Sequence, residues 1–299
     1  MREFSLRPII LCLVFLLLTA GPESRANKGR TVKGALILSG AAGLSREKFG
    51  AGVLEKFVAL AGGPEASFIY IPTASSGIKL DSGFIYTPPD SDLPAANTAE
   101  FEQELAKMFG VKRITILHTR NRRTANSPGF VAPLRSAGGV WISGGNSGRL
   151  ADAYLGTRTE KEIRAVFERG GVVGGDSAGA MIQGSFIVRG RPDKPVLMAT
   201  GHQRGFGFLD RVVVNPHLTA AKREDELINV VDAHPELLGI GIDERTAILV
   251  QGDRFEVLGD SKVAIYDNQK HENRWYYWLA PGSLFDLRKR AVIKARGSD

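Results

Sequence analysis

Short apolar runs of β-forming residues alternate with helical patterns along most of the chain, and this alternation limits the fold more than any other feature. Strands that alternate with helices are typical of βαβ units and of a parallel sheet. The sequence therefore predicts an α/β fold of mostly parallel sheet flanked by helices. The expected strands are 35–38, 67–71, 113–117, 140–142, 172–173 and 212–214, and the expected helices include 46–60, 97–109 and one that starts near Thr159.

The pattern becomes purely β-like beyond about residue 245. A hairpin around Gly252-Asp253 is expected, and two further segments extend it. We therefore expect antiparallel hairpins at one edge of the sheet, within a single domain that covers residues 27–299. The four segments are 246–250, 255–258, 263–266 and 275–279.

The first 26 residues have the pattern of a signal peptide. Arg2 and Arg7 precede a short apolar run, 9–18, and small residues follow it. The run is short for a transmembrane helix, which leaves a retained membrane anchor as the less favoured alternative. We expect cleavage after Ala20 or Ala26 and export to the periplasm or the extracellular space.

Composition excludes several kinds of chemistry. The one cysteine, Cys12, lies inside the apolar run, so the exported chain would have no disulfide, thiol nucleophile or thiolate metal site. The net charge of +7 is modest and its Lys and Arg residues are scattered, which favours a solvated surface over nucleic-acid binding. We expect no cofactor, no metal and no membrane contact after cleavage, and we keep a homodimer as an open possibility.

Glycine-rich segments follow the strands that end at Leu38, Ile142 and Val173. In parallel sheets ligands bind outside the carboxyl ends of the strands, so these segments are expected to converge. The segment 75–97 contains three prolines and no periodicity, which predicts a long loop with a functional role.

A possible nucleophile lies in the last of these glycine-rich segments. Gly175-Asp176-Ser177-Ala178-Gly179 fits the G-x-S-x-G pattern of a nucleophile elbow, in which a tight strand-to-helix turn presents a Ser hydroxyl. The alternative is a glycine-rich turn whose Ser only caps a helix.

A Ser nucleophile needs a base and an acid that orients the base. Of the five histidines, His217 alone follows a buried strand and the strand-ending pair Asn215-Pro216. A structural role for His217 is the alternative. Glu244 lies among apolar residues and glycines between two β segments, where a charge needs a partner such as His217.

Together these residues resemble the serine peptidase family of cyanophycinase and peptidase E. The resemblance covers roughly residues 34–268 and rests on Gly144-Gly145, Gly175 to Ala180, His217 and Gly241-Ile242-Asp243-Glu244. It implies a flavodoxin-like sheet of the class-I glutamine amidotransferase type. Ser177 would be the nucleophile, His217 the base and Glu244 the acid. Glu244 favours the cyanophycinase branch, whereas Asn215-Pro216-His217 is more similar to peptidase E.

The resemblance also implies how the site would hold a substrate. The oxyanion would accept hydrogen bonds from the Ala178 N–H and from an N–H of Gly144 or Gly145. Substrate contacts are expected from Asn146, Ser147, Asn215 and Arg223. Arg223 is expected to set a preference for acidic substrates by contacting a bound carboxylate, unless it pairs with Glu226 on a helix that faces solvent.

Several positions depart from the cyanophycinase pattern. Ala221 and Glu226 stand where two of that pattern's arginines would be, Ser147 replaces a Gln and Arg245 replaces an Asp. The core residues for hydrolysis are kept, while the groups that would hold a β-aspartyl-arginine unit are partly changed. We therefore expect a secreted serine peptidase, cyanophycinase-like, that acts on aspartyl or β-aspartyl peptides.

Two other functions fit some of the same residues. An esterase of the α/β-hydrolase fold also has G-x-S-x-G, but its His follows the acid in the chain, whereas His217 precedes Glu244. A non-catalytic binding protein on an amidotransferase-like scaffold would not need all three candidate residues.

Overall fold

The structure is a computed structural model, and it describes Met1 and residues 34–90, 95–194 and 196–294. The predicted signal peptide, 1–26, lies outside these described residues apart from Met1. The described residues from Gly34 onward form one compact unit. Among the residues described, no helix is both long and apolar enough to cross a membrane.

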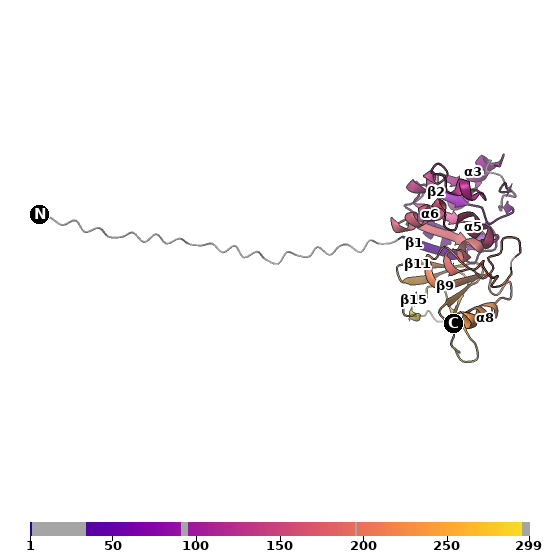
Figure 1. Cartoon of the computed structure of the whole chain (residues 1–299), viewed down its shortest axis with the longest axis vertical. Coiled ribbons are helices and arrows are strands. Elements are labelled where there is room, and N and C mark those ends of the chain that lie inside the picture. Colours follow the sequence, from indigo (N-terminus) through magenta and orange to yellow (C-terminus); the bar gives the residue numbers. More distant parts are fainter. Residues whose placement is uncertain (2–33, 91–94, 195, 295–299) are drawn as a thin grey trace. The chain divides into compact units, whose positions relative to one another are not determined.

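A nine-stranded sheet forms the centre of this unit, in the order β16-β15-β12-β11-β1-β7-β6-β2-β5. The five strands from β1 to β5 in this order are parallel, whereas β11 runs antiparallel to β1 and starts the antiparallel edge. Figure 1 shows β2 with α3 at one end of the unit and β15 at the other, with β1 and β11 between them. The strands are β1 (Ala35–Ser39), β2 (Phe68–Ile71), β5 (Ile114–Ile116), β6 (Gly139–Ile142), β7 (Val172–Asp176), β11 (Thr246–Gln251), β12 (Arg254–Gly259), β15 (Leu284–Asp286) and β16 (Ala291–Lys294).

A second sheet of five strands has the order β14-β13-β10-β9-β8. Its members are β8 (Gly184–Phe186), β9 (Leu209–Pro216), β10 (Leu238–Ile242), β13 (Val263–Tyr266) and β14 (Tyr277–Leu279), while β3 (Ile78–Lys79) and β4 (Ile85–Tyr86) pair separately. The predicted α/β class is confirmed, and the hairpin of β11 and β12 lies where the sequence placed it. The expectation that 263–266 and 275–279 extend that hairpin is wrong, because β13 pairs with β10 and β14 pairs with β13, both in the second sheet.

The helices cover both faces of the central sheet. Successive side chains of a strand point to opposite faces, so each strand contributes to the cores on both sides. In β1, Ile37 packs in one core with α2 and α3, while Leu36 and Leu38 pack in the other with α5, α6 and the second sheet. The helices are α1 (Arg46–Phe49), α2 (Val53–Leu60), α3 (Thr98–Phe109), α4 (Arg122–Ala125), α5 (Ser147–Tyr154), α6 (Arg158–Glu168), α7 (Ala178–Met181) and α8 (Glu226–Ala233), with a 3-10 turn at Ala132–Ser136.

The predicted helix 46–60 is interrupted after Phe49. Gly50 and Gly52 both have positive φ, which a continuous right-handed helix does not allow. A Cβ at Gly50 would lie 2.0 Å from the carbonyl oxygen of Arg245, so the break brings α1 against the start of β11. Helical periodicity alone gives no sign of this contact.

Candidate active site

Ser177 lies on a sharp turn between β7 and α7. Its backbone has φ 51° and ψ −112°, a conformation that costs free energy in any residue other than glycine and that concentrates at functional sites. The close packing behind the turn requires small residues: a Cβ at Gly179 would lie 1.9 Å from the carbonyl oxygen of Ile142 in β6. The predicted strand–turn–helix geometry of a nucleophile elbow is therefore present at Ser177.

His217 faces Ser177 from the second sheet. It follows β9 directly, also with a positive φ, and its Nε2 lies 2.8 Å from Ser177 Oγ. That distance is a hydrogen bond through which an imidazole can take the hydroxyl proton. Burial lowers the pKa of His217; Glu244 acts to raise this pKa, and Arg223 to lower it. A lowered pKa keeps the imidazole neutral, which is the form that accepts a proton.

Glu244 lies on the other side of the imidazole. Its Oε1 is 3.4 Å from His217 Nδ1, longer than a well-formed hydrogen bond, and its side chain is 40% exposed. Catalytic hydrogen bonds are often long before a substrate binds. Ser177, His217 and Glu244 thus contact one another in that order. The Ser177–His217 contact is a hydrogen bond, and the His217–Glu244 contact is longer than one.

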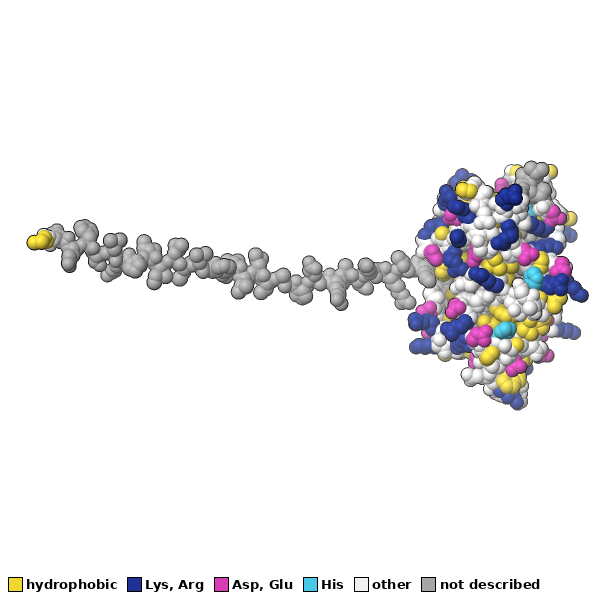
Figure 2. Space-filling view, viewed as in Figure 1, with side chains coloured by type: hydrophobic (Ala, Val, Ile, Leu, Met, Phe, Trp, Pro, Cys, Tyr) yellow, Lys and Arg dark blue, Asp and Glu magenta, His cyan; other side chains and the backbone are white. Residues whose placement is uncertain are grey.

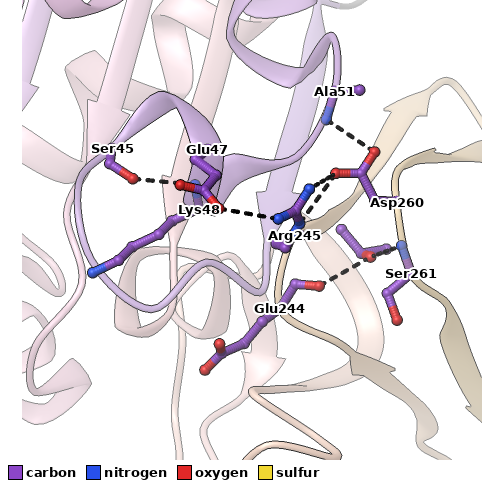
Figure 3. Close-up of polar contacts among 9 residues, drawn as sticks. Ser45, Glu47, Lys48, Ala51, Glu244, Arg245, Asp260 and Ser261 are labelled. Atoms are coloured by element: carbon purple, nitrogen blue, oxygen red, sulfur yellow. Dashed lines mark hydrogen bonds and ion pairs between the residues drawn. The ribbon is translucent and has the colours of Figure 1, made fainter.

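The turn that carries Glu244 is fixed on both sides of that residue. Asp243 accepts hydrogen bonds from the Thr219 N–H at 2.9 Å and from Ser261 Oγ at 2.9 Å. Arg245 lies between Glu47 and Asp260, with Nη2 2.8 Å from Asp260 Oδ2 and Nη1 3.3 Å from Glu47 Oε1 (Figure 3).

The Glu244 side chain points away from this network of ion pairs (Figure 3). The two neighbours of Glu244 are thus held by hydrogen bonds and ion pairs, while its carboxylate contacts His217 at 3.4 Å. The Arg that replaces the Asp of the cyanophycinase pattern at position 245 therefore has a structural function here.

A cavity of about 400 Å³ opens beside Ser177 and His217. Its walls include the glycine-rich turn after β6 and the start of the loop predicted over 75–97, as expected. Two cations, Arg149 and Lys79, also line it. Neither of them forms a salt bridge with another of the described residues. Arg149 Nη1 donates only to the Ala74 carbonyl at 3.4 Å among the side-chain hydrogen bonds of the described residues. A cavity whose cations have no carboxylate partner among the described residues suits an anionic substrate.

The two glycines of the expected oxyanion hole differ in their contacts. The Gly144 N–H donates to the Asp176 carboxylate at 2.9 Å, which removes it from the donors that would face a substrate. Gly145 lines the cavity, and Ala178 is the first residue of α7, where backbone N–H groups have no partner within the helix. The expected oxyanion donors that remain are therefore the N–H groups of Gly145 and Ala178.

Each of the four expected substrate-binding residues forms a side-chain hydrogen bond within the protein. Ser147 is buried and donates to the Arg189 carbonyl at 2.8 Å, and Asn215 is buried and donates to Glu226 at 3.0 Å. Asn146 lines the cavity, but its side chain caps α5 and donates to the Arg191 carbonyl. Ser147 and Asn215 are thus buried and are not among the residues that line the cavity.

Arg223 is half-buried near His217 and donates to the Pro216 carbonyl at 3.3 Å. It does not line the cavity. The expected alternative, an exposed pair with Glu226, is also not what forms, since Glu226 makes its salt bridge with Arg189. Glu226 is thus an acidic neighbour of both arginines: it forms its salt bridge with Arg189 and acts to raise the pKa of Arg223.

Sequence reasoning assigned no function to Arg149, Lys79 or the Asp176 side chain. Arg149 occupies the first turn of the helix that follows β6, and Asp176 is a charged residue at the end of a buried strand. The position of each residue, on the helix that follows a buried strand or at the end of one, could have marked it as a site residue from the sequence. Within the described part of the chain, no group of three His, Cys, Asp or Glu residues is arranged to hold a metal ion.

A Ser hydroxyl on a strand-to-helix turn, with a partly buried imidazole at hydrogen-bond distance, is the geometry of a serine hydrolase on an α/β sheet. The model of peptidase family S51 matches residues 36–258, so the chain belongs to that family of peptidases. This membership confirms the resemblance to cyanophycinase and peptidase E, and it favours neither the esterase nor the binding protein.

Relatives in sequence point the same way. The chain is 29% identical to a cyanophycinase from Nostoc sp. over 89% of this chain and 90% of that protein. It is 29% identical to a cyanophycinase from Synechococcus elongatus over 79% of this chain and 70% of that protein.

Two solved structures share the fold. One is a peptidase from an acI-B1 Actinobacterium, with TM-score 0.63, 25% identity and coverage of 86% of this chain and 98% of that chain. The other is a putative peptidase E from Listeria monocytogenes, with TM-score 0.50, 16% identity and coverage of 77% and 100%, a likeness of fold alone.

Proposed function

We propose that this chain is an exported serine peptidase that cleaves peptide or isopeptide bonds next to an aspartyl or β-aspartyl residue. The observation that carries the proposal is the 2.8 Å contact between His217 Nε2 and Ser177 Oγ at the edge of a cavity. The two cations of the cavity, Arg149 and Lys79, support an acidic substrate.

The reaction would begin when Ser177 Oγ attacks the substrate carbonyl and His217 takes the hydroxyl proton. Glu244 would stabilise the imidazolium and fix its orientation. The N–H groups of Gly145 and Ala178 would bind the oxyanion of the tetrahedral intermediate. His217 would then donate its proton to the leaving amine, and water would release the acyl group from Ser177 by the same steps.

The test of the site is Ser177→Ala. We expect kcat on a β-aspartyl dipeptide to fall on the order of 10⁴-fold or more, with an unchanged melting temperature. A fluorophosphonate probe should label the unaltered protein and not the variant. Near-normal turnover by Ser177→Ala would show that another group is the nucleophile.

The proposal of export rests on residues 1–26 alone. N-terminal sequencing of protein recovered from the native host should start near Gly21 or Asn27. Intact Met1 on protein in the soluble cytoplasmic fraction would contradict export and leave the assignment of the peptidase unchanged.

The spread of charge on the surface gives no support to a nucleic-acid substrate. On the face shown in Figure 2, Lys and Arg side chains are interspersed with Asp and Glu. Binding of nucleic acid depends on neutralising a run of phosphates, which requires clustered cations. A peptide remains the substrate that the site favours.

A further inference from the structure

Asp176 is a buried carboxyl group that takes no part in the steps of the proposed reaction. It ends β7, directly before Ser177, and its side chain is almost fully shielded from solvent. A buried charge is costly unless hydrogen bonds compensate it. The contacts of Asp176 therefore carry information about why the carboxyl group is there.

Both oxygens of Asp176 accept from N–H groups of the neighbouring strand and its turn. Oδ1 lies 2.8 Å from Trp141 Nε1 in β6, and Oδ2 lies 2.9 Å from the Gly144 nitrogen just after β6. An indole N–H and a backbone N–H donate and never accept. Two donors thus face one carboxylate, and a carboxamide at this position would turn its own NH₂ group toward one of them.

The second of these bonds sets the orientation of the glycine turn. A Cβ at Gly144 would lie 2.6 Å from Asp176 Oδ2 and 3.1 Å from the Cβ of Ser177, so the turn packs directly against the nucleophile. The next residue, Gly145, has φ 137° and lines the cavity. The hydrogen bond from the Gly144 N–H holds the peptide plane directly before the one that carries the Gly145 N–H, so it anchors the turn at Gly144.

We infer that Asp176, as the carboxylate, is a positioning residue that holds the Gly144–Gly145 turn so that the Gly145 N–H faces the oxyanion. This inference rests on the proposed function. Asp176 touches no reacting atom and acts through Gly144. A donor aligned with the oxyanion acts in the transition state, so its misalignment lowers kcat more than it changes KM.

A dependence on pH follows from the same geometry. Burial raises the pKa of Asp176 to about 7, against the hydrogen bonds from Trp141 and Gly144, which lower it. The protonated acid would point an O–H at one of two donors and lose that bond. The turn is therefore held fully above pH 7 and is loosened as the pH falls through about 7.

Other titratable groups lie near Asp176, and the pKa values of two of them are shifted in opposite directions. Tyr70 of β2 is buried, and its pKa is raised by that burial and by Asp176, so it stays neutral. His217 has a lowered pKa and titrates below Asp176. Arg149 and Lys79 line the same cavity.

The experiment compares the full chain with Asp176→Asn, a change that keeps the shape of the side chain. We expect kcat to fall about 10- to 100-fold on a β-aspartyl dipeptide at pH 8 while KM changes less than about threefold. The pH profile of kcat should lose its step near 7 and keep only the lower step of His217. An unchanged kcat and an unchanged step near 7 would overturn the inference.

A second measurement needs no activity. In ¹⁵N-labelled Ser177→Ala protein, the indole N–H resonance of Trp141, assigned with Trp141→Phe, should shift with a midpoint near pH 7. Adding Asp176→Asn should abolish that shift. A Trp141 resonance that stays constant from pH 5.5 to 8.5 would overturn the inference even if Asp176→Asn failed to fold.

The two proposals fail in different ways. If unaltered protein hydrolyses no β-aspartyl peptide and takes up no fluorophosphonate, the proposed function and this inference are both wrong. If unaltered protein is active and Asp176→Asn matches it in kcat, only the inference is wrong.

Discussion

Ser177 and His217 meet although they belong to two different sheets. Ser177 follows β7 of the nine-stranded sheet, His217 follows β9 of the five-stranded sheet, and their side chains are 2.8 Å apart. Glu244 lies on the connection from β10 of the second sheet to β11 of the first. The candidate site is therefore built at the junction of the sheets, and its alignment depends on how they pack.

The charges around His217 provide a test of this alignment. Arg223 lowers the pKa of the imidazole, so replacing it with Met removes a positive neighbour and raises that pKa. The neutral imidazole is the active form, and a higher pKa means that activity is lost at a higher pH. We expect the lower step in the pH profile of kcat/KM to move upward in Arg223→Met.

The matched comparison for this shift is Glu244→Gln, which removes a negative neighbour and should move the same step downward. Both profiles are measured on a neutral substrate, so that binding of a carboxylate does not enter. An Arg223→Met profile that overlays that of the unaltered protein would place Arg223 too far from His217 to influence it.

Two arginines, Arg149 and Arg223, are candidates for the recognition of an acidic substrate. Arg149 lines the cavity beside Ser177, whereas Arg223, which the sequence favoured, lies outside the lining. A guanidinium binds a carboxylate through paired charge-assisted hydrogen bonds. Loss of such a contact costs about 1.5–3 kcal/mol, or roughly ten- to a hundredfold in kcat/KM.

We therefore expect Arg149→Met to lower kcat/KM for an aspartyl dipeptide by that factor and to leave the matched asparaginyl dipeptide nearly unchanged. Arg223→Lys, measured on the same pair, shows which arginine carries the preference. An equal loss on both substrates in Arg149→Met would exclude Arg149 from carboxylate binding.

Local sequence patterns were sufficient to predict the parallel strands and the positions of Ser177, His217 and Glu244. The reason is that a strand end, a glycine-rich turn and a polar residue are adjacent in the chain, so a short stretch of sequence indicates the site. The pattern at 263–266 could not show that β13 pairs with β10, because a strand's partner is set by the packing of distant segments.

The same limit applies to the contacts of the predicted site residues. Asn146, Ser147 and Gly144 follow a strand end, as binding residues do, but their contacts depend on segments more than 30 residues away. Ser147 meets the Arg189 carbonyl, and Gly144 meets Asp176. Position along the chain predicted proximity to the site, whereas side-chain direction required the tertiary structure.

The packing behind the nucleophile gives the last prediction. A methyl group at Gly179 would lie 1.9 Å from the Ile142 carbonyl oxygen, so Gly179→Ala must push α7 away from β6. Overpacking of a rigid core typically costs 1–3 kcal/mol, and a contact with backbone has little room to relax. We expect a loss of about 3 kcal/mol or more in the free energy of unfolding by urea. Gly129→Ala, where no atom lies within 4 Å, is the control and should change it by less than about 0.5 kcal/mol. Equal stability of the two variants would mean that the turn at Ser177 is not held by the approach of α7 to β6.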